Sequence, residues 1–375
     1  MNKPIRVLQV GMSPNYGGTE SFIMSQYRSI NREIVQFDFL NVYNVPIACE
    51  EEIKKLGGKI YHLDLSRRHG IVKYFKRIDS FFKNNKDGID IVHCNVQSLI
   101  NIDMLKYAKK NGIQGRIIHA HNAGYGVEPN FIQKAIIRHN KKKLAAYANQ
   151  YFACSSLAGQ WMFGDLKTTI VKNAINVEKF QYNIDKRNEF RSKNNLQNNK
   201  VALFVGRLDP QKNPLFLVNI FSKMILADNS WKLLIVGDGI LRADVEKEIA
   251  KLGLQEYVSM LGSRNDVDLI MQGADCFLLP SKFEGLGIVL IEAQTAGLKC
   301  FTSKDVVPSE VDVTGLVDFI SLNDMADKWA EIICKYGDNY KRKNQQENVI
   351  KAGFSSDKNA DELENLYIKL VAGEQ

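Results

Sequence analysis

The chain has 375 residues, of which 45% are hydrophobic and 25% charged, and its formal net charge is +8 at pH 7. This length suits two hydrophobic cores better than one, and the composition is that of an ordinary globular protein. No apolar run in the sequence reaches the roughly 18 residues that a membrane-spanning helix needs, so we expect no such helix.

The positive charge is concentrated in the first half of the chain. Residues 1–170 hold 24 Lys and Arg against 13 Asp and Glu, whereas the remainder is slightly acidic. An anionic partner of the first half is one interpretation, and ordinary solvated lysines are the other. The first residues predict a strand rather than a signal peptide, and the six cysteines form no C-x-x-C pair. We therefore expect a cytoplasmic protein with reduced thiols.

Short apolar runs alternate with helical segments along almost the whole chain. The runs that predict buried strands in the first half are Arg6–Gly11, Phe37–Val42, Lys59–Leu65, Asp90–Cys94, Arg116–Ala120, Tyr151–Ser155 and Thr169–Lys172. Those in the second half are Val201–Val205, Trp231–Val236, Tyr257–Leu261, Cys276–Leu279 and Lys299–Phe301. This alternation predicts an α/β fold with two doubly wound parallel sheets, joined near residues 173–199, where the apolar periodicity lapses. Ligands should bind at the carboxyl ends of the strands, facing a cleft between the two domains.

The most informative segment runs from Glu284 to Ala293. Glu284 precedes an apolar helix that ends near Gly297, and Glu292 is expected about one turn inside this helix. Backbone N–H groups of the first turn are unpaired and can hold an anion. Carboxylates on both sides of this cradle suit a ligand with a diphosphate in the middle and hydroxyl groups at both ends. A nucleotide sugar is such a ligand.

Two cations follow the first strand of the second series. Arg207 and Lys212 lie in the loop that precedes Pro214, which suits a helix start. Fixed cations at a strand's carboxyl end match a leaving diphosphate, whose charge must be neutralised. Alone, such a pair would be taken for surface residues; beside the Glu284 segment, it predicts a site. Gly237-Asp238-Gly239 lacks the third glycine of a dinucleotide fingerprint and predicts a tight turn that lines the cleft.

The first half offers two further candidates. Gly17 and Gly18 follow the first strand, where glycines let backbone N–H groups approach a phosphate or sugar, although such a pair is more often only a turn. His119 and His121 end a strand, and His121 is the better candidate for a sugar contact. No third ligand accompanies them, so we do not predict a metal site. Asp266-Val-Asp268 is interpreted as carboxylates at a helix N-terminus rather than as a metal motif.

The segment Phe131–Ala148 predicts an apolar helix with a basic patch. Together with Arg67–His69 and the lysines and arginine at 73, 76 and 77, it would either face an anionic membrane or form a solvated surface. Nucleic acid is not an expected partner, because the basic residues lack interleaved aromatic residues.

With these residues assembled, the chain resembles the retaining GT-B glycosyltransferases of family 4, and within them the EpsF-like enzymes of exopolysaccharide and capsule synthesis. The resemblance rests mainly on Gly17–Glu20, His119–Asn122, Gly206–Pro214, Gly237–Gly239 and Glu284–Ala293. It implies that Glu284 contacts the donor sugar and Glu292 the ribose, while Arg207 and Lys212 hold the diphosphate. Backbone N–H groups around Leu286 and Gly287 would help them. Gly17 and Gly18 would approach the donor phosphates or the acceptor, and His121 the transferred sugar.

The same resemblance implies the domain organisation and the reaction. Residues 1–175 would form an acceptor domain, residues 176–355 a donor domain, and residues 356–375 a helix that packs back on the first domain. The enzyme would move a hexose from a nucleotide sugar, most simply a UDP-sugar, to a lipid-linked exopolysaccharide or capsular glycan. It would need no metal or other cofactor. Two enzymatic alternatives of similar architecture are a sugar-nucleotide epimerase and a phosphorylase, and a non-enzymatic one is a nucleotide-sugar-binding subunit of a transferase complex.

Overall fold

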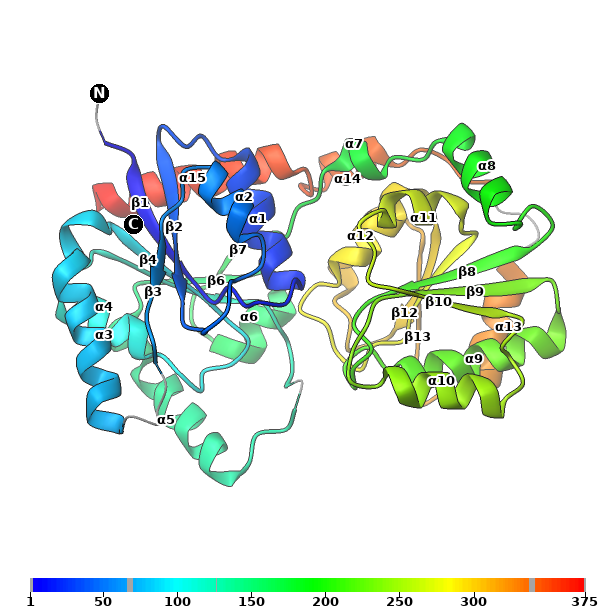
Figure 1. Ribbon diagram of the computed structural model, residues 1–375, viewed down its shortest axis with the longest axis horizontal. Coiled ribbons are helices and arrows are strands. Elements are labelled where there is room, and N and C mark those ends of the chain that lie inside the picture. Colours follow the sequence, from blue (N-terminus) through cyan, green and yellow to red (C-terminus); the bar gives the residue numbers. More distant parts are fainter. Residues whose placement is uncertain (1–2, 66–69, 126, 337–340, 374–375) are drawn as a thin grey trace. The chain divides into compact units, whose positions relative to one another are not determined.

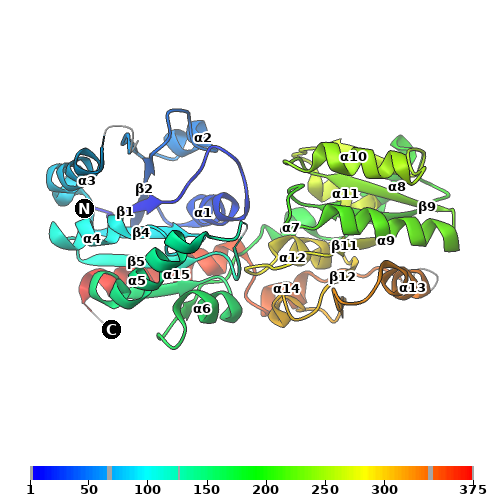
Figure 2. The ribbon, with the colours of Figure 1, turned by 90° about the horizontal axis from the view of Figure 1, so that it is seen from below.

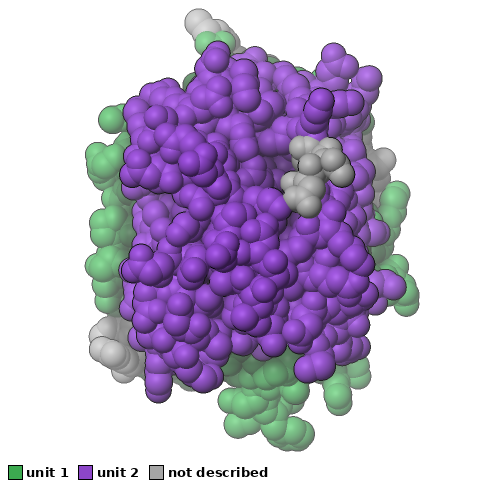
Figure 3. All heavy atoms as spheres, turned by 90° about the vertical axis from the view of Figure 1, so that its right-hand side faces the viewer, with its two compact units in different colours: residues 1–174, 355–375 green, residues 175–354 purple. Residues whose placement is uncertain are grey.

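The computed structural model describes residues 3–65, 70–125, 127–336 and 341–373, and the chain divides into two compact units. Unit 1 consists of Met1–Ala174 and Ser355–Gln375, and unit 2 of Ile175–Phe354; Figure 3 colours them green and purple. The expected boundaries, after residues 175 and 355, each lie one residue further along the chain.

Unit 1 is built on a parallel sheet of seven strands in the order β3-β2-β1-β4-β5-β6-β7. The strands are β1 (Ile5–Val10), β2 (Val35–Asn41), β3 (Ile60–His62), β4 (Ile91–Val96), β5 (Gly115–Ala120), β6 (Gln150–Ala153) and β7 (Thr169–Ile170). The helices that follow them are α1 (Gly18–Ser29), α2 (Glu50–Lys55), α3 (Ile71–Asn85), the short η2 (Lys86–Gly88), α4 (Asp103–Lys110), α5 (Phe131–Tyr147) and α6 (Ser156–Phe163).

The last helix of the chain also belongs to unit 1. Figure 1 shows α15 (Ser356–Ala372, red) beside α1 and β1 (blue). Leu363 and Tyr367 of α15 are buried in one apolar cluster with Phe22 and Tyr27 of α1 and Phe37 of β2. This packing confirms the prediction that the C-terminal helix returns to the first domain.

Unit 2 contains a second parallel sheet, of six strands in the order β10-β9-β8-β11-β12-β13. The strands are β8 (Lys200–Val205), β9 (Trp231–Val236), β10 (Val258–Gly262), β11 (Cys276–Leu279), β12 (Lys299–Ser303) and β13 (Val317–Ile320). The other elements are α7 (Val177–Phe180), α8 (Ile184–Lys193), α9 (Pro214–Ala227), α10 (Arg242–Lys251), α11 (Val267–Gly273), α12 (Ile288–Thr295), η3 (Ser309–Val311), α13 (Ala326–Tyr336) and α14 (Gln346–Lys351).

Helices cover both faces of the sheet in unit 2. In Figure 1, α9 and α10 lie on one face and α11 and α12 on the other, and Figure 2 gives the same arrangement from below. Both faces of the strands are therefore buried, which explains why their sequences are nearly continuous apolar runs. The predicted α/β class with two doubly wound sheets is confirmed. No helix in the described ranges is long and apolar enough to cross a membrane.

The polar join contains two helices that the apolar pattern does not predict. In α8 the buried residue is Arg191, whose guanidinium donates hydrogen bonds to the carbonyl oxygens of Gly273 (2.8 Å) and Leu196 (2.7 Å). The neighbouring Arg187 donates to the carbonyl oxygen of Ala274 (2.6 Å). Because arginine–carbonyl contacts hold α8 in place, its sequence lacks the apolar period that reveals an ordinary surface helix.

Candidate active site

Three loops of unit 2 carry the predicted donor residues, and they follow neighbouring strands. Arg207 and Lys212 follow β8, Gly237 follows β9, and Glu284 follows β11. Strand β8 pairs with both β9 and β11 in parallel. The carboxyl ends of these strands therefore meet at one edge of the sheet, where ligands of open α/β sheets bind.

Lys212 and Glu284 form an ion pair at this edge. Nζ of Lys212 lies 2.5 Å from Oε1 of Glu284, and the side chains are only 15% and 6% exposed. Oγ of Ser281 donates to the same Oε1 at 2.6 Å. The sequence analysis assigns these two residues separate roles and does not predict the pair. Oε1 accepts both bonds, so Oε2 of Glu284 is the oxygen that remains for a ligand.

Backbone contacts hold the two loops together around this pair. The N–H of Lys282 donates to the carbonyl oxygen of Gln211 at 2.8 Å, and Nε2 of Gln211 donates to the carbonyl oxygen of Phe283 at 3.2 Å. The N–H of Glu284 donates to the carbonyl oxygen of Val306 at 3.0 Å. The cation and the carboxylate are therefore fixed before any ligand arrives, which is the arrangement that stabilises developing charge most effectively.

The N-terminus of α12 lies next to Glu284 in the chain. Gly287 is the N-cap with a φ of 83°, and the helix starts at Ile288. Among the described residues, the backbone N–H groups of Leu286, Gly287, Ile288 and Val289 have no hydrogen-bond acceptor within the chain. Such N–H groups at the positive end of a helix dipole bind anions.

Arg207 is held more loosely than Lys212. Its guanidinium is 63% exposed and lies 3.3 Å from the carboxylate of Asp209. Its loop packs against the glycine turn after β9: the N–H of Leu208 donates to the carbonyl oxygen of Asp238 (3.0 Å). A Cβ atom on Gly237, whose φ is 131°, would lie 2.0 Å from the carbonyl oxygen of Gly206. The turn predicted at Gly237-Asp238-Gly239 is thus the support of the Arg207 loop.

Glu292 lies on α12, half-buried, near an ion pair between Lys179 and Asp268 (3.3 Å). Burial raises the pKa of Glu292 to about 7, while Lys179 lowers it and Asp268 raises it further. Asp268 is in the first turn of α11, and Asp266, its N-cap, pairs with Arg264. Both carboxylates of the Asp266-Val-Asp268 sequence therefore have cationic partners.

In unit 1, the buried carboxylate of Glu20 shapes the glycine loop after β1. It accepts hydrogen bonds from the backbone N–H (3.0 Å) and Oγ (2.8 Å) of Ser13 and from the N–H of Gly17 (3.0 Å). A Cβ on Gly18 would meet no atom within 4 Å. Sequence reasoning missed the role of Glu20, although a Glu three residues after an N-cap is the signature of a capping box.

His121 follows β5 at the same edge of the unit 1 sheet. Its Nε2 lies 2.8 Å from Oδ1 of Asn95, and its ring packs against Phe22 of α1, with centroids 5.0 Å apart. Nε2 of Gln97, after β4, donates to Oγ1 of Thr19 at 2.6 Å. The structure thus gathers the glycine loop and His121 at the adjoining strands β1, β4 and β5.

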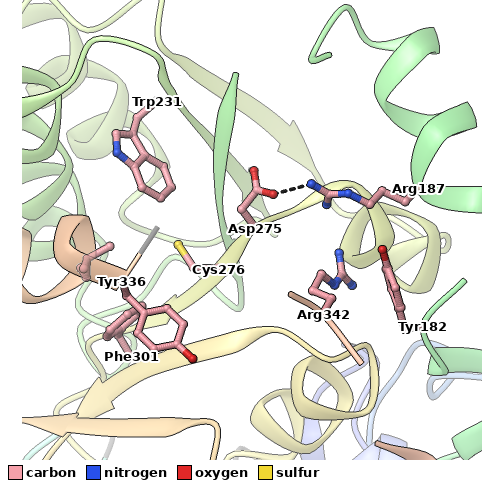
Figure 4. Close-up of a pocket in the computed structure, with 9 residues that line it drawn as sticks. Tyr182, Arg187, Trp231, Asp275, Cys276, Phe301, Tyr336 and Arg342 are labelled. Atoms are coloured by element: carbon pink, nitrogen blue, oxygen red, sulfur yellow. Dashed lines mark hydrogen bonds and ion pairs between the residues drawn. The ribbon is translucent and has the colours of Figure 1, made fainter. Parts of the chain in front are cut away.

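A cavity of about 160 Å³ lies elsewhere in unit 2. Figure 4 shows its lining, with Arg187 paired to Asp275 at 2.5 Å. Trp231 and Asp275 lie at the amino ends of β9 and β11, the edge opposite to Glu284. Arg342 donates to the carbonyl oxygens of Gln272 and Ala274 (2.6 and 2.8 Å). Its guanidinium therefore caps the C-terminal end of α11. None of the predicted site residues belongs to its described lining.

Comparisons with known proteins agree with this geometry. Residues 185–356 match the family model described as "Glycosyl transferases group 1". The chain is 29% identical to "Putative glycosyltransferase EpsF" of Bacillus subtilis (strain 168), over 96% of each protein. It is 27% identical to the "UDP-Gal:alpha-D-GlcNAc-diphosphoundecaprenol alpha-1,3-galactosyltransferase" of Escherichia coli, over 98% of this chain and 97% of that protein.

Solved structures establish the fold. The glycosyltransferase from Rickettsia africae ESF-5 superimposes with a TM-score of 0.76 at 18% identity, covering 99% of both chains. Anabaena Alr3699/HepE in complex with UDP and glucose gives a TM-score of 0.73 at 14% identity, covering 98% of both chains. The family match covers residues 185–356, nearly the whole of unit 2, the two relatives align over almost the full length, and the solved structures show that the chain has the GT-B fold of glycosyltransferases.

Proposed function

We propose that this protein transfers a hexose, with retention of configuration, from a UDP-sugar to a lipid-linked glycan during exopolysaccharide or capsule synthesis. The observation that carries the proposal is the fixed pair of Lys212 and Glu284 beside the unpaired N–H groups of α12. The Escherichia coli relative is named for a UDP-galactose donor and a diphosphoundecaprenol-linked acceptor, and a solved structure of the same fold holds UDP and glucose.

The donor's charge is matched by groups of unit 2. The diphosphate accepts hydrogen bonds from the N–H groups of residues 286–289, from Arg207 and from Lys212. An ammonium group has three N–H donors, so Lys212 keeps its bond to Glu284 and still reaches a phosphate oxygen. As the glycosidic bond breaks, negative charge grows on the leaving diphosphate and these fixed donors stabilise it. On this proposal the reaction uses no metal ion.

The hydroxyl groups of the donor meet the two carboxylates. Oε2 of Glu284 accepts from the transferred sugar, and Glu292 accepts from the ribose. From unit 1, Gly17 and Gly18 let backbone N–H groups approach the donor phosphates or the acceptor, and His121 contacts the transferred sugar.

A panel of UDP- and GDP-sugars tests the donor half of the proposal. At least one UDP-sugar should raise the unfolding temperature and be slowly hydrolysed, and transfer should appear when a polyprenyl-diphosphate sugar is added. Conversion of the UDP-sugar to an epimer would instead support the epimerase alternative. Binding without any turnover, with or without acceptor, would support a non-catalytic subunit.

The raised pKa of Glu292 predicts that UDP affinity depends on pH. Ribose hydroxyls that donate to the carboxylate favour its ionised form, so UDP affinity should rise as the pH goes from about 5 to about 8. The dependence should flatten in Glu292→Gln, whereas Glu178→Gln, an exposed change on α7, should retain it. Isothermal titration with UDP gives both curves, and equal slopes in all three proteins would remove Glu292 from the ribose site.

Helix α5 supports peripheral contact with an anionic membrane. Its buried residue is Leu144, while Phe131 (87%) and Ile132 (69%) are exposed at one end, beside the exposed Val127 (85%). Five cationic residues follow, namely Lys134, Arg138, Lys141, Lys142 and Lys143. Exposed apolar residues next to cations are typical of helices that lie in a membrane interface. Arg67–His69, which the sequence placed in the same surface, are outside the described residues.

Vesicle cosedimentation tests this contact. The protein should bind vesicles that contain phosphatidylglycerol and not vesicles of phosphatidylcholine alone. Replacing Lys142 and Lys143 with Glu should weaken binding at least about tenfold, since each cation near an anionic surface contributes about 1 kcal/mol. The matched control is Lys186→Glu with Lys247→Glu, the same charge change on exposed residues of unit 2. Equal weakening by both pairs would show a general charge effect and not a surface formed by α5.

A further inference from the structure

A chain of buried polar side chains crosses the core of unit 1, between the sheet and the C-terminal helix. Its members come from three strands, a strand end and α15, and all are buried except His121, which is partly buried. They are Gln9, His93, Asn95, His119, His121 and Tyr367. Their hydrogen bonds form one continuous series, so the direction of each bond depends on its neighbours.

Asn95 fixes that direction. Its Nδ2 faces three oxygens: Oε1 of Gln9 (2.9 Å) and the carbonyl oxygens of Val10 (3.3 Å) and His93 (3.4 Å). Backbone carbonyls can only accept, so the atom that faces them must be the NH₂ group and the amide cannot be turned over. Oδ1 of Asn95 therefore faces His121, and Nε2 of His121, 2.8 Å away, must carry a hydrogen.

The same logic runs in the other direction to α15. Oε1 of Gln9 accepts from Asn95, so its Nε2 donates to Oη of Tyr367 (3.4 Å). Tyr367 then donates its hydroxyl hydrogen to Nδ1 of His93 (2.7 Å). Burial lowers the pKa of His93 to about 3, so its ring is neutral and its one hydrogen is on Nε2. That hydrogen goes to Nδ1 of His119, 3.1 Å away.

Within the described residues, the series ends in two unpaired atoms. His119 accepts at Nδ1, so its hydrogen is on Nε2, which is buried without a partner. Nδ1 of His121 is also buried without a partner, and it is a bare acceptor because the ring's hydrogen is on Nε2. Burial lowers the pKa of His121 to about 3, which keeps this ring neutral as well. The two rings lie against each other, with centroids 4.1 Å apart.

We propose that Asn95 is a positioning residue that fixes His121 in its Nε2–H tautomer, so that Nδ1 of His121 can only accept a hydrogen bond, from a hydroxyl group. An unpaired buried acceptor is unfavourable and calls for a partner, which the described part of the chain does not supply. A carboxylate or phosphate oxygen cannot provide a hydrogen to it. On the proposed function, in which His121 contacts the transferred sugar, the partner is a sugar hydroxyl, and a deoxy or carboxylate group at that position is disfavoured.

Nitrogen NMR of the full chain, with ¹⁵N-labelled histidine, tests the tautomer directly. Long-range ¹H–¹⁵N spectra separate ring nitrogens that carry a hydrogen from those that do not, and single replacements assign the six histidines. In the ligand-free protein at neutral pH, His121 should show a hydrogen on Nε2 and a bare Nδ1. A hydrogen on Nδ1, or on both nitrogens, would overturn the assignment whether or not the protein is an enzyme.

Variants of the series separate positioning from general packing. Asn95→Leu should leave His121 without a fixed tautomer, and Asn95→Asp, which keeps the shape, should place hydrogens on both ring nitrogens. Tyr367→Phe is the matched control, since it breaks the series at His93 and should leave His121 unchanged. An Asn95→Leu spectrum with the native His121 signature would overturn the proposal. A bare Nε2 in Asn95→Asp would overturn it as well, because the carboxylate also requires a hydrogen there, and this variant remains informative if Asn95→Leu does not fold.

Adding ligands distinguishes the source of the hydroxyl. The UDP-sugar that the donor panel identifies should move the Nδ1 resonance of His121 toward that of a hydrogen-bonded acceptor, whereas UDP alone should not. Asn95→Asp should then lower kcat/KM for this donor about tenfold, with UDP affinity unchanged. A resonance already at the hydrogen-bonded position without ligand would identify a water molecule and overturn the sugar contact. Donor turnover with no response of His121 would overturn this inference while leaving the proposed function intact.

Discussion

Replacing Lys212 with alanine should lower the turnover of the donor on the order of 10²-fold or more, as loss of one preorganised charge-stabilising donor typically does. The change removes a cation beside the leaving diphosphate and also leaves the carboxylate of Glu284, 6% exposed, without its ionic partner. Arg207→Ala should cost a similar factor. Turnover of the identified UDP-sugar measures both, and UDP affinity, measured separately, shows how much of each loss is ground-state binding.

The control for this prediction is Lys282→Ala. Lys282 is exposed and belongs to the loop of Glu284, so its loss removes the same charge from the same region without touching the ion pair. It should leave turnover within about twofold of native, since an exposed charge contributes little. Near-normal turnover in both Lys212→Ala and Arg207→Ala would contradict the roles assigned to them.

Replacing Gly237 with alanine should destabilise unit 2 by more than about 3 kcal/mol, because a backbone conformation that L-residues avoid and a steric clash act together. The φ of Gly237 is 131°, and the added Cβ would lie 2.0 Å from the carbonyl oxygen of Gly206. Backbone on both sides must then move, and with it the loop that carries Arg207 and Lys212. Urea unfolding followed by the fluorescence of Trp231, buried in unit 2, reports the change.

Gly253→Ala separates the two causes. Gly253 also has a positive φ, 68°, but a Cβ there would meet no atom within 4 Å. It should cost only about 1–2 kcal/mol, the price of the left-handed conformation alone. If both variants lose a similar free energy of unfolding, the contact between the Gly237 turn and the Arg207 loop does not contribute to stability.

The sequence predicted the strands well where they are buried and apolar, and poorly where they are not. Strands β8, β9 and β11 were predicted almost to the residue because each is a short, continuous apolar run. Strand β13 was missed: it is an edge strand, an aspartate interrupts its short sequence Val-Asp-Phe-Ile, and two of its four residues are only partly buried. Helix α5 was expected to be an apolar helix with a basic patch, and most of its apolar residues are exposed.

For the site, the sequence placed Arg207, Lys212, Gly237 and Glu284 at strand ends, because strand-to-loop transitions are visible in the apolar pattern. It could not reveal the ion pair of Lys212 and Glu284, which are 72 positions apart. That contact requires β8 and β11 to be neighbours, and strand order is a property of the whole sheet. The buried series through Asn95 could not be predicted either. A polar residue in a strand does not reveal which side chain of another strand it bonds to, or whether that side chain donates or accepts.

The position of α15 determines the order in which the chain can fold as it is synthesised. Unit 2 is continuous, from Ile175 to Phe354, and all its residues precede those of α15 in the chain. Unit 1 must wait: Leu363 and Tyr367 belong to its core, and Tyr367 closes the buried series at His93. Until they emerge, the apolar surface of β1, β2 and α1 that they cover is open. The half of the protein that is made first can therefore complete its core only after all of unit 2 has been synthesised.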